Sequence, residues 1–187
     1  MADQKIYRIS LTGDLGSGKS TAGEIIAERL QIEKFTLGTI QRKMAEEHNM
    51  STIEFNRYLE DKPEMDIVFD DWQKAFEQRE GSFIMDSRLG FHFVPSTFSY
   101  YLSVDITESA RRIMSANRSS EQYRSLEEAV AKIHERRESE RLRFKEFYGV
   151  DILDMNNYDC IIDTTHLSPS EVADEIIKNY KYKMGNK

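Results

Sequence analysis

Hydrophobic and polar positions follow two different periods along the chain, and both periods are present at its start. Residues 6–11 alternate apolar and polar side chains and lead into a Thr-Gly pair, which is typical of a strand that ends at a turn. Between residues 19 and 30, apolar side chains recur at helical spacing: Ile25, Ile26, Ala27 and Leu30. The chain is therefore predicted to begin with a strand, a glycine-rich turn and a helix.

Further short apolar segments predict more strands, and the longer segments between them predict helices. The strand candidates are residues 34–37, 82–86, 100–106 and 159–163. The helix candidates are residues 39–60, 64–79, 107–118, 125–147 and 169–181. Strands that alternate with helices indicate an α/β fold, with a parallel sheet covered by helices on both faces.

The last helix has the clearest sequence signals. Ser168 can cap it, Pro169 occupies its first turn, and Glu171 completes a capping box. One apolar stripe follows, formed by Val172, Ile176 and Tyr180. In contrast, residues 107–148 are rich in Arg and Glu and contain few apolar positions in their middle. We expect them to form a mobile excursion from the sheet rather than an element of the core.

Composition narrows the class of protein. The 187 residues suit one compact domain, and the net charge of −7 argues against a general nucleic-acid binder. A single cysteine, Cys160, excludes an internal disulfide framework and fits a reducing cytoplasm. The start of the chain lacks a signal-peptide pattern, and no apolar run approaches the roughly 20 residues that span a bilayer. We therefore expect a soluble cytoplasmic protein that binds no membrane.

The pattern G-x-x-x-x-G-K-S is present after the first strand. Glycines let successive backbone N–H groups face an anion, and the following helix adds the positive end of its dipole. Lys19 can reach the β- and γ-phosphates of ATP, and the Ser20 hydroxyl can ligate Mg²⁺. The predicted ATP-binding residues are Gly13, Gly16, Ser17, Gly18, Lys19, Ser20 and Thr21. A plain glycine-rich turn is the alternative, but the strand and helix around the pattern favour a phosphate loop. Asp14 is an unexpected residue beside a polyphosphate, and we expect its side chain to point away.

Arginines supply candidates for the charge that phosphoryl transfer requires. Arg136 and Arg143 lie two helical turns apart, hence on one face, and Glu140 between them can orient a guanidinium. Such a segment is often only a solvated, charge-laced helix. On a chain that also carries a phosphate loop, a lid that closes over ATP is the better interpretation.

Two other arginines follow predicted strands, at the edge where parallel sheets bind ligands. Arg42 comes after the second strand and Arg88 after the third, so either could hold an acceptor phosphate, although a surface arginine is the alternative for each. Asp86, at the end of the third strand, could hold Mg²⁺ through water or cap a turn. Asp105 looks like the N-cap of the helix after the fourth strand.

The order of these motifs extends over nearly the whole chain. They comprise residues 9–13, the Gly38-x-x-x-Arg42 segment, and residues 50–55, 86–89, 136–144, 148–151 and 158–159. In this order the chain resembles the cytidylate kinases, particularly the short form typified by archaeal members and their bacterial relatives.

The resemblance implies a P-loop nucleoside monophosphate kinase fold with a five-stranded parallel sheet, a monophosphate-binding arm and a helical lid. We expect a single domain over residues 1–187, with its core in 1–36, 81–106 and 149–187, its arm in about 37–80 and its lid in about 107–148. The matching residues imply that Arg42 and Arg88, with Gly38 and Asp86, bind the acceptor. Lys19, Arg136, Arg143 and Glu140 are implied as the catalytic residues.

Two positions depart from the family pattern. Leu37 stands where many cytidylate kinases have Ser, and Leu89 stands where many bacterial members have an Asp that helps to recognise cytosine. The expected reaction is transfer of the γ-phosphate of Mg-ATP to CMP or dCMP, with UMP possible as acceptor. The alternatives are a hydroxyl kinase of the shikimate or gluconate type, with Asp86 as base, and a non-catalytic ATP-binding module. The sequence leaves the exact base, the sugar and the oligomeric state open.

Overall fold

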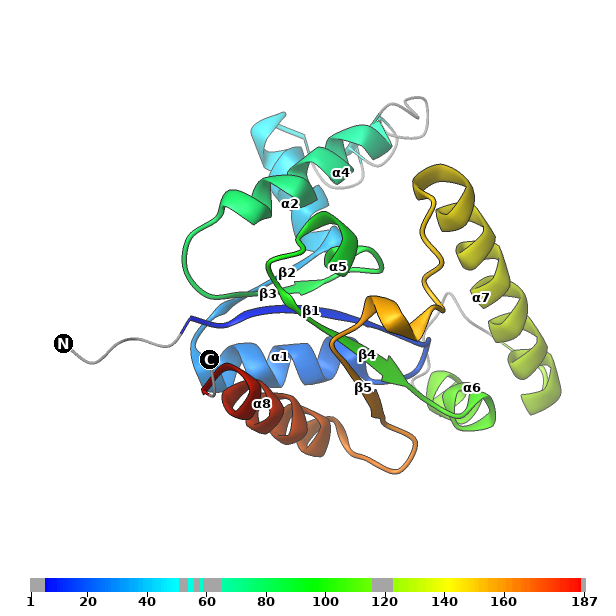
Figure 1. Ribbon diagram of the computed structural model, residues 1–187. Coiled ribbons are helices and arrows are strands. Elements are labelled where there is room, and N and C mark those ends of the chain that lie inside the picture. The colour runs from blue at the N-terminus through cyan, green and yellow to red at the C-terminus, as the bar shows by residue number, and fades with distance from the viewer. Residues whose placement is uncertain (1–5, 51–53, 56–57, 59–64, 116–122, 186–187) are drawn as a thin grey trace.

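The computed structural model describes residues 6–50, 54–55, 58, 65–115 and 123–185. Its centre is a parallel sheet in the order β2-β3-β1-β4-β5 (Figure 1). The strands are β1 (Arg8–Gly13), β2 (Glu33–Thr36), β3 (Phe83–Asp86), β4 (Phe98–Ser103) and β5 (Cys160–Asp163). The predicted α/β class and five-stranded parallel sheet are confirmed.

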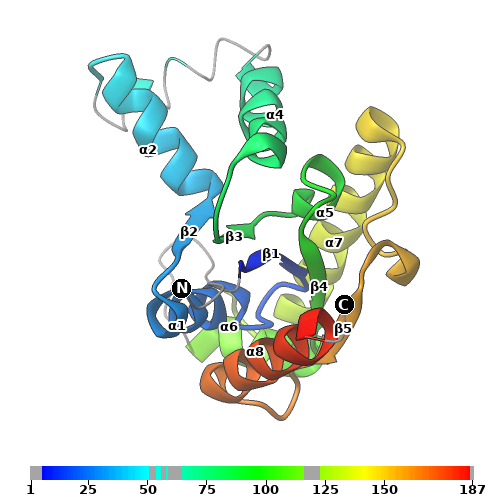
Figure 2. The ribbon, with the colours of Figure 1, turned by 60° about the vertical axis from the view of Figure 1, so that its left-hand side comes forward.

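Helices cover both faces of the sheet. On one face α1 (Lys19–Leu30) and α8 (Pro169–Gly185) lie side by side (Figures 1 and 2). The other face carries α5 (Gly90–Phe93), the 3-10 turn η1 (Phe76–Gln78) and the C-terminal part of α7 (Leu126–Tyr148). Figure 2 shows α2 (Leu37–Glu47) and α4 (Met65–Ala75) standing above this second face. The remaining elements are α6 (Ile106–Ser115) and the 3-10 turn η2 (Met155–Asn157).

The alternation of side chains along the strands divides the core in two. Successive strand residues point to opposite faces, so Ile9, Leu11 and Ile84 pack on the side of α1 and α8. Phe83 and Met85, which flank Ile84 along β3, pack on the other side with the aromatic residues of η1 and α5. The α8 stripe predicted from the sequence is buried in the first cluster.

The strands end together at one edge of the sheet. β1 is central: the chain leaves it for β2 through α1 on one face and passes from β3 to β4 through α5 on the other, which makes this edge a topological switch point. Open parallel sheets bind ligands at such a point. The residues that follow β1 and β3 therefore meet where a ligand is expected.

Several predicted boundaries are wrong for identifiable reasons. The predicted helix at 39–60 begins earlier, at Leu37, because Thr36 and Thr39 form a capping box. It ends at Glu47, where the following turn places Asn49 at a φ of 54°. The predicted helix at 64–79 becomes a 3-10 turn after Ala75.

The fourth strand and the helix after it are both shifted towards the N-terminus. β4 spans Phe98–Ser103 rather than 100–106, because the Asp105 carboxylate caps α6 by accepting from two backbone N–H groups at 3.0 Å. That capping role was predicted. α6 ends at Ser115, and residues 116–118 of the predicted helix lie outside the described part of the chain.

Helices α6 and α7 contribute more to the core than their charged sequences suggest. Ala110 and Ile113 of α6 pack against Ala129 and Ile133 of α7 in a small separate cluster. Phe144, near the end of α7, is buried in the main cluster on the second face. The expectation that residues 107–148 lie outside the core is therefore wrong for α7.

Candidate functional site

The turn between β1 and α1 has the shape of a phosphate-binding loop. β1 ends at Gly13, whose φ is 155°, and a Cβ there would lie 2.3 Å from the carbonyl oxygen of Leu102. Only glycine fits this approach. Gly18 forms the N-cap of α1 in the left-handed conformation, and the N-terminus of the helix then opens toward the sheet edge. The predicted loop residues Gly16, Ser17 and Thr21 lie in and directly after this turn.

Asp86 joins the two polar side chains at the end of the loop. It ends β3 and is buried, it forms an ion pair with the Lys19 ammonium, and it accepts a hydrogen bond of 2.9 Å from the Ser20 hydroxyl. Burial lowers the pKa of Lys19 below its usual value, and the Asp86 carboxylate opposes that change. The aspartate at the end of β3 thus lies against the lysine and the serine of the loop, a pairing that the sequence analysis did not predict.

These oxygens suit a magnesium ion. The Ser20 hydroxyl and the Asp86 carboxylate lie within hydrogen-bond distance of each other, and hard oxygen donors of this kind are what Mg²⁺ prefers. Two protein oxygens leave room for the waters and phosphate oxygens that complete a magnesium shell. The residues present therefore fit the Mg-ATP that was predicted for this loop.

Glu140 joins two of the predicted arginines. Its carboxylate lies 3.1 Å from Arg88 Nε and 3.1 Å from Arg136 Nε. Arg88 also donates to the Gly13 carbonyl oxygen at the start of the phosphate loop. α7 therefore places the Glu140 carboxylate and the Arg136 guanidinium beside Arg88, which follows the end of β3.

Two other predicted arginines lie apart from this group. The Arg143 guanidinium is exposed and lies over the ring of Phe144, 4.9 Å from its centre. Arg42 is exposed on α2, and a Cβ placed at Gly38 would lie 3.7 Å from Arg42 Nη1. The structure therefore brings together Arg88, Glu140 and Arg136, whereas Arg143 lies over Phe144 and Arg42 lies on α2.

Sequence reasoning missed the partners of Asp14. Its carboxylate accepts from the Tyr101 hydroxyl at 2.7 Å and from the Val104 N–H at 3.2 Å, and it lies 3.4 Å from Arg137 Nε. Burial and the hydrogen bond to Asp14 raise the pKa of Tyr101. The Asp14 side chain is thus bound by Tyr101 of β4, by Val104 directly after β4 and by Arg137 of α7.

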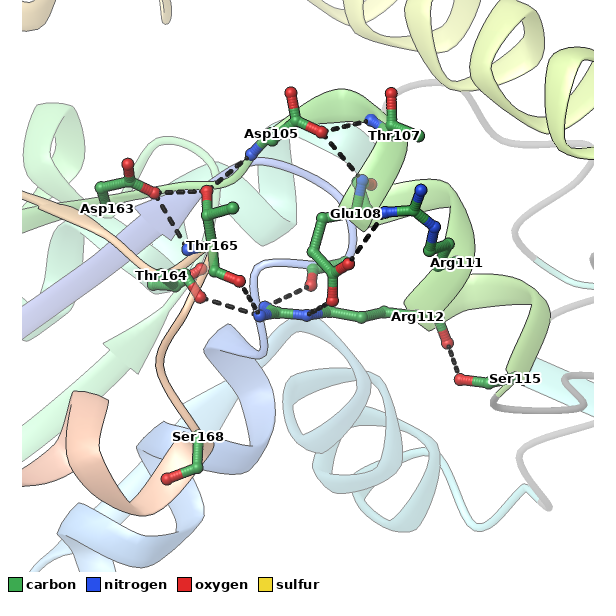
Figure 3. A network of polar contacts seen from close by, with 12 residues as sticks. Asp105, Thr107, Glu108, Arg111, Arg112, Ser115, Asp163, Thr164, Thr165 and Ser168 are labelled. Atoms are coloured by element: carbon green, nitrogen blue, oxygen red, sulfur yellow. Dashed lines mark hydrogen bonds and ion pairs between the residues drawn. The ribbon is translucent and has the colours of Figure 1, made fainter.

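Arg112 of α6 is a second residue that the sequence did not reveal. Figure 3 shows its guanidinium among Glu108, Thr164 and Thr165. It donates to the carbonyl oxygens of Thr164 and Thr165 at 2.8 and 2.9 Å, and to the Gly16 carbonyl oxygen at 3.4 Å. Arg112 therefore ties α6 to the phosphate loop and to the segment after β5. No sequence signal distinguished it from Arg111.

A cavity of about 30 Å³ lies between the phosphate loop, the end of β4 and α7. Four of its wall residues are charged: Asp14, Arg88, Arg137 and Glu140. Such a volume holds one or two waters. These four charged side chains of the site thus converge on one small pocket beside α7.

The comparisons with known proteins agree with this geometry. A model of the cytidylate kinase-like family matches residues 8–166. The chain belongs to the cytidylate kinase-like family. A cytidylate kinase from Sulfolobus acidocaldarius is 34% identical over 173 residues, which cover 91% of this chain and 92% of that protein. One from Methanosarcina acetivorans is 31% identical, over 89% of this chain and 92% of that protein. This member of the family is an enzyme, a P-loop kinase.

One relative is a longer protein with a different name. An S-adenosylmethionine-dependent nucleotide dehydratase from Lacinutrix mariniflava is 36% identical over 175 residues. The match covers 93% of this chain, but the chain spans only 36% of the length of that protein. The likeness therefore concerns about a third of the dehydratase.

Solved structures share the fold. A shikimate kinase from Bacteroides thetaiotaomicron has a TM-score of 0.65 at 17% identity, over 97% of this chain and 99% of that one. An uncharacterized protein from Eubacterium ventriosum has a TM-score of 0.69 at 15% identity, over 94% of this chain and 98% of that one. At such identities the likeness concerns the fold alone. Within the described ranges, none of the helices has the length and apolar character needed to cross a membrane.

Proposed function

We propose that the protein transfers the γ-phosphate of Mg-ATP to the α-phosphate of a pyrimidine nucleoside monophosphate, CMP or dCMP, in the cytoplasm. The observation that carries this proposal is the position of the Arg88–Glu140–Arg136 group beside the phosphate loop. The likeness to cytidylate kinases over about nine-tenths of the chain supports the choice of acceptor. A nucleotide is also the substrate named for the longer dehydratase relative.

The loop end of the site binds the donor. Backbone N–H groups of the loop and the Lys19 ammonium hold the phosphates of ATP, and Ser20 and Asp86 hold the magnesium ion. The ion, when bound, neutralises negative charge on the phosphates. Because Asp86 already pairs with Lys19 and Ser20, these three side chains are in place before ATP arrives.

The arginines bind the acceptor and the transferred group. Arg88 faces the acceptor phosphate, and Arg42, carried by the proposed arm at about 37–80, closes on it from the other side. Arg136 of the proposed lid at about 107–148 faces the γ-phosphate and is held in orientation by Glu140, and Arg143 leaves the Phe144 ring to join it there. The acceptor phosphate is already anionic at neutral pH, so the reaction needs no protein base; positioning and charge stabilisation are sufficient.

This scheme leaves Glu140 with two roles. Before substrates bind, its carboxylate occupies the position between Arg88 and Arg136 in which an anionic phosphate would also be held. We infer that the acceptor phosphate replaces Glu140 on Arg88, while Glu140 keeps its contact with Arg136 within α7. The exchange replaces one anion by another, so no arginine is left without a partner.

The hydroxyl-kinase alternative requires Asp86 to act as a base. Both oxygens of Asp86 are engaged, one by Lys19 and the other by Ser20. An acceptor hydroxyl would have to displace one of these two contacts before it could reach Asp86. This arrangement favours a phosphate acceptor over a hydroxyl acceptor.

A coupled ADP-release assay tests the proposal. The enzyme with Mg-ATP is offered CMP, dCMP, UMP, AMP, GMP, shikimate and gluconate in separate reactions. We expect kcat/KM for CMP or dCMP to exceed that for the purine nucleotides by at least about tenfold, and no turnover of the two hydroxyl acceptors. Turnover of shikimate or gluconate, or of none of the monophosphates, would contradict the proposal.

A further inference from the structure

Asp14 is the one acidic residue of the phosphate loop, and its carboxylate is almost enclosed. Only 11% of the side chain is exposed, and both of its oxygens are in contact. One faces the Tyr101 hydroxyl and Arg137, and the other faces the Val104 N–H. A carboxylate in this position adds a negative charge where ATP must bring several more. The charge is tolerable only if a cation compensates it.

Arg137 is that cation, and it is held by charge rather than by good hydrogen-bond geometry. Its Nε lies 3.4 Å from the Asp14 carboxylate. The same Nε atom is buried and has no hydrogen bond within the described part of the molecule. A buried N–H without a hydrogen bond is costly, so the free arginine gains when a better acceptor arrives. Phosphate oxygens are such acceptors, because they bind guanidinium in pairs of parallel hydrogen bonds.

The position of Arg137 is set by the packing of α7. Ile133 and Phe144 fix the helix on either side of this residue. Arg136, its neighbour in sequence, turns instead to Glu140 on the same helix. Arg137 is thus the arginine of α7 whose side chain reaches the phosphate loop, and it lines the small cavity beside the loop with Arg88.

We propose that Arg137 transfers its guanidinium from Asp14 to the γ-phosphate when Mg-ATP binds, and that Asp14 holds Arg137 over the loop until then. Arg137 then acts as a catalytic arginine, and Asp14 acts as a positioning residue. The inference rests on the proposed function. In the reaction the bond between the γ-phosphorus and ADP breaks as the bond to the acceptor oxygen forms. Arg137 donates hydrogen bonds throughout and exchanges no proton.

When Arg137 moves from Asp14 to the γ-phosphate, both side chains still have partners. When Arg137 leaves, the Asp14 carboxylate still accepts from the Tyr101 hydroxyl and from the Val104 N–H. Arg137 in turn passes from a single carboxylate contact to a phosphate that carries more charge. Removal of Arg137 alone would leave the Asp14 charge uncompensated beside ATP, whereas removal of both groups would not. This asymmetry separates the proposal from a merely structural ion pair.

A double-mutant cycle tests it, with Arg137→Gln, Asp14→Asn and the double variant. We expect Arg137→Gln to lower kcat by about 100-fold or more, within the range that a transition-state arginine supplies, and to raise KM for ATP. Asp14→Asn should lower kcat less than tenfold, because Arg137 can still reach the phosphate. Adding Asp14→Asn to Arg137→Gln should restore much of the affinity for ATP without restoring kcat.

Matched measurements keep the test decisive. Lys132→Gln, an exposed lysine one turn earlier on α7, should leave kcat unchanged, and thermal melts show whether each variant folds. The proposal would be overturned if the KM for ATP of the double variant changed by the product of the two single fold-changes. An unchanged kcat in Arg137→Gln would also overturn it. If the wild type transfers phosphate to no monophosphate, the proposed function fails. Titration of Mg-ATP into the wild type, the two single variants and the double variant then still decides the inference. Arg137→Gln must bind Mg-ATP more weakly than the wild type, and the double variant must bind it more tightly than Arg137→Gln.

Discussion

Asp86 accepts contacts from Lys19 and from Ser20 at once, so one buried carboxylate organises the two loop side chains that we propose to bind Mg-ATP. Replacement of Asp86 by Asn removes the charge but keeps the shape. We expect kcat/KM to fall by about 10- to 100-fold, the usual cost of losing a group that orients a metal ligand. The Mg²⁺ concentration that gives the half-maximal rate should rise as well. Initial rates over a series of Mg²⁺ concentrations measure both effects.

Asp163 provides the control for this variant. It ends β5 as Asp86 ends β3, but it is exposed, and among the described residues its carboxylate bonds to Thr165 alone, so Asp163→Asn should leave the magnesium dependence unchanged. In Asp86→Asn, high Mg²⁺ should recover part of the rate. A loss of several orders of magnitude that Mg²⁺ does not relieve would indicate a catalytic base and contradict this role.

Arg136 is half exposed and contacts Glu140 one turn away, so its replacement should affect catalysis far more than folding. We expect Arg136→Ala to lower kcat by about 100-fold or more, because a lid arginine stabilises charge only in the transition state. Steady-state kinetics with saturating ATP and CMP measure this. Lys132→Ala, at an exposed position of the same helix, is the control and should behave as the wild type. An unchanged kcat in Arg136→Ala would remove it from the mechanism.

Sequence reasoning predicted those residues of the candidate site that carry a local signal in the sequence. The phosphate loop was found because its glycines, lysine and serine have a fixed spacing, and Asp86 and Arg88 were found because they follow a strand. Glu140 was found from its helical spacing to Arg136. Each of these signals is local, and each refers to a backbone geometry that only certain residues permit.

The contacts that were missed join segments far apart in sequence. The Asp14–Arg137 pair spans more than a hundred residues, and nothing in the sequence distinguished Arg137 from the neighbouring Arg136. Arg143 shows the reverse case: its spacing places it on the face of Arg136, and in this structure its long side chain lies over Phe144. Helix spacing determines where a Cα lies, and the partner available in the fold determines where a guanidinium goes.

The end of α7 predicts a pH effect on stability. Arg141 donates to the Asp151 carboxylate at 2.7 Å, and this hydrogen bond holds the pKa of Asp151 below its usual value. A lowered folded pKa contributes stability above the unfolded pKa, and that stability is lost as pH falls through the folded pKa. Asp151→Asn should therefore have a lower Tm than the wild type at neutral pH. The difference should shrink as pH falls below about 4.

Thermal melts of both proteins between neutral and acidic pH test this prediction. Asp154→Asn is the control, since Asp154 bonds to Asn156 and not to a cation, and its effect on Tm should vary less with pH. A Tm difference between wild type and Asp151→Asn that stays constant through the acidic range would contradict the assigned role of the Arg141–Asp151 pair.

The central claim is that the γ-phosphate moves directly from ATP to the phosphate of a pyrimidine nucleotide. The most direct measurement follows labelled γ-phosphate from Mg-ATP in the presence of CMP, with the wild type and with Arg88→Met. We predict that the wild type places the label in CDP with little release as inorganic phosphate, and that Arg88→Met slows this transfer by about 100-fold or more. Label that appears only in inorganic phosphate, or transfer to CDP that does not depend on Arg88, would contradict the account.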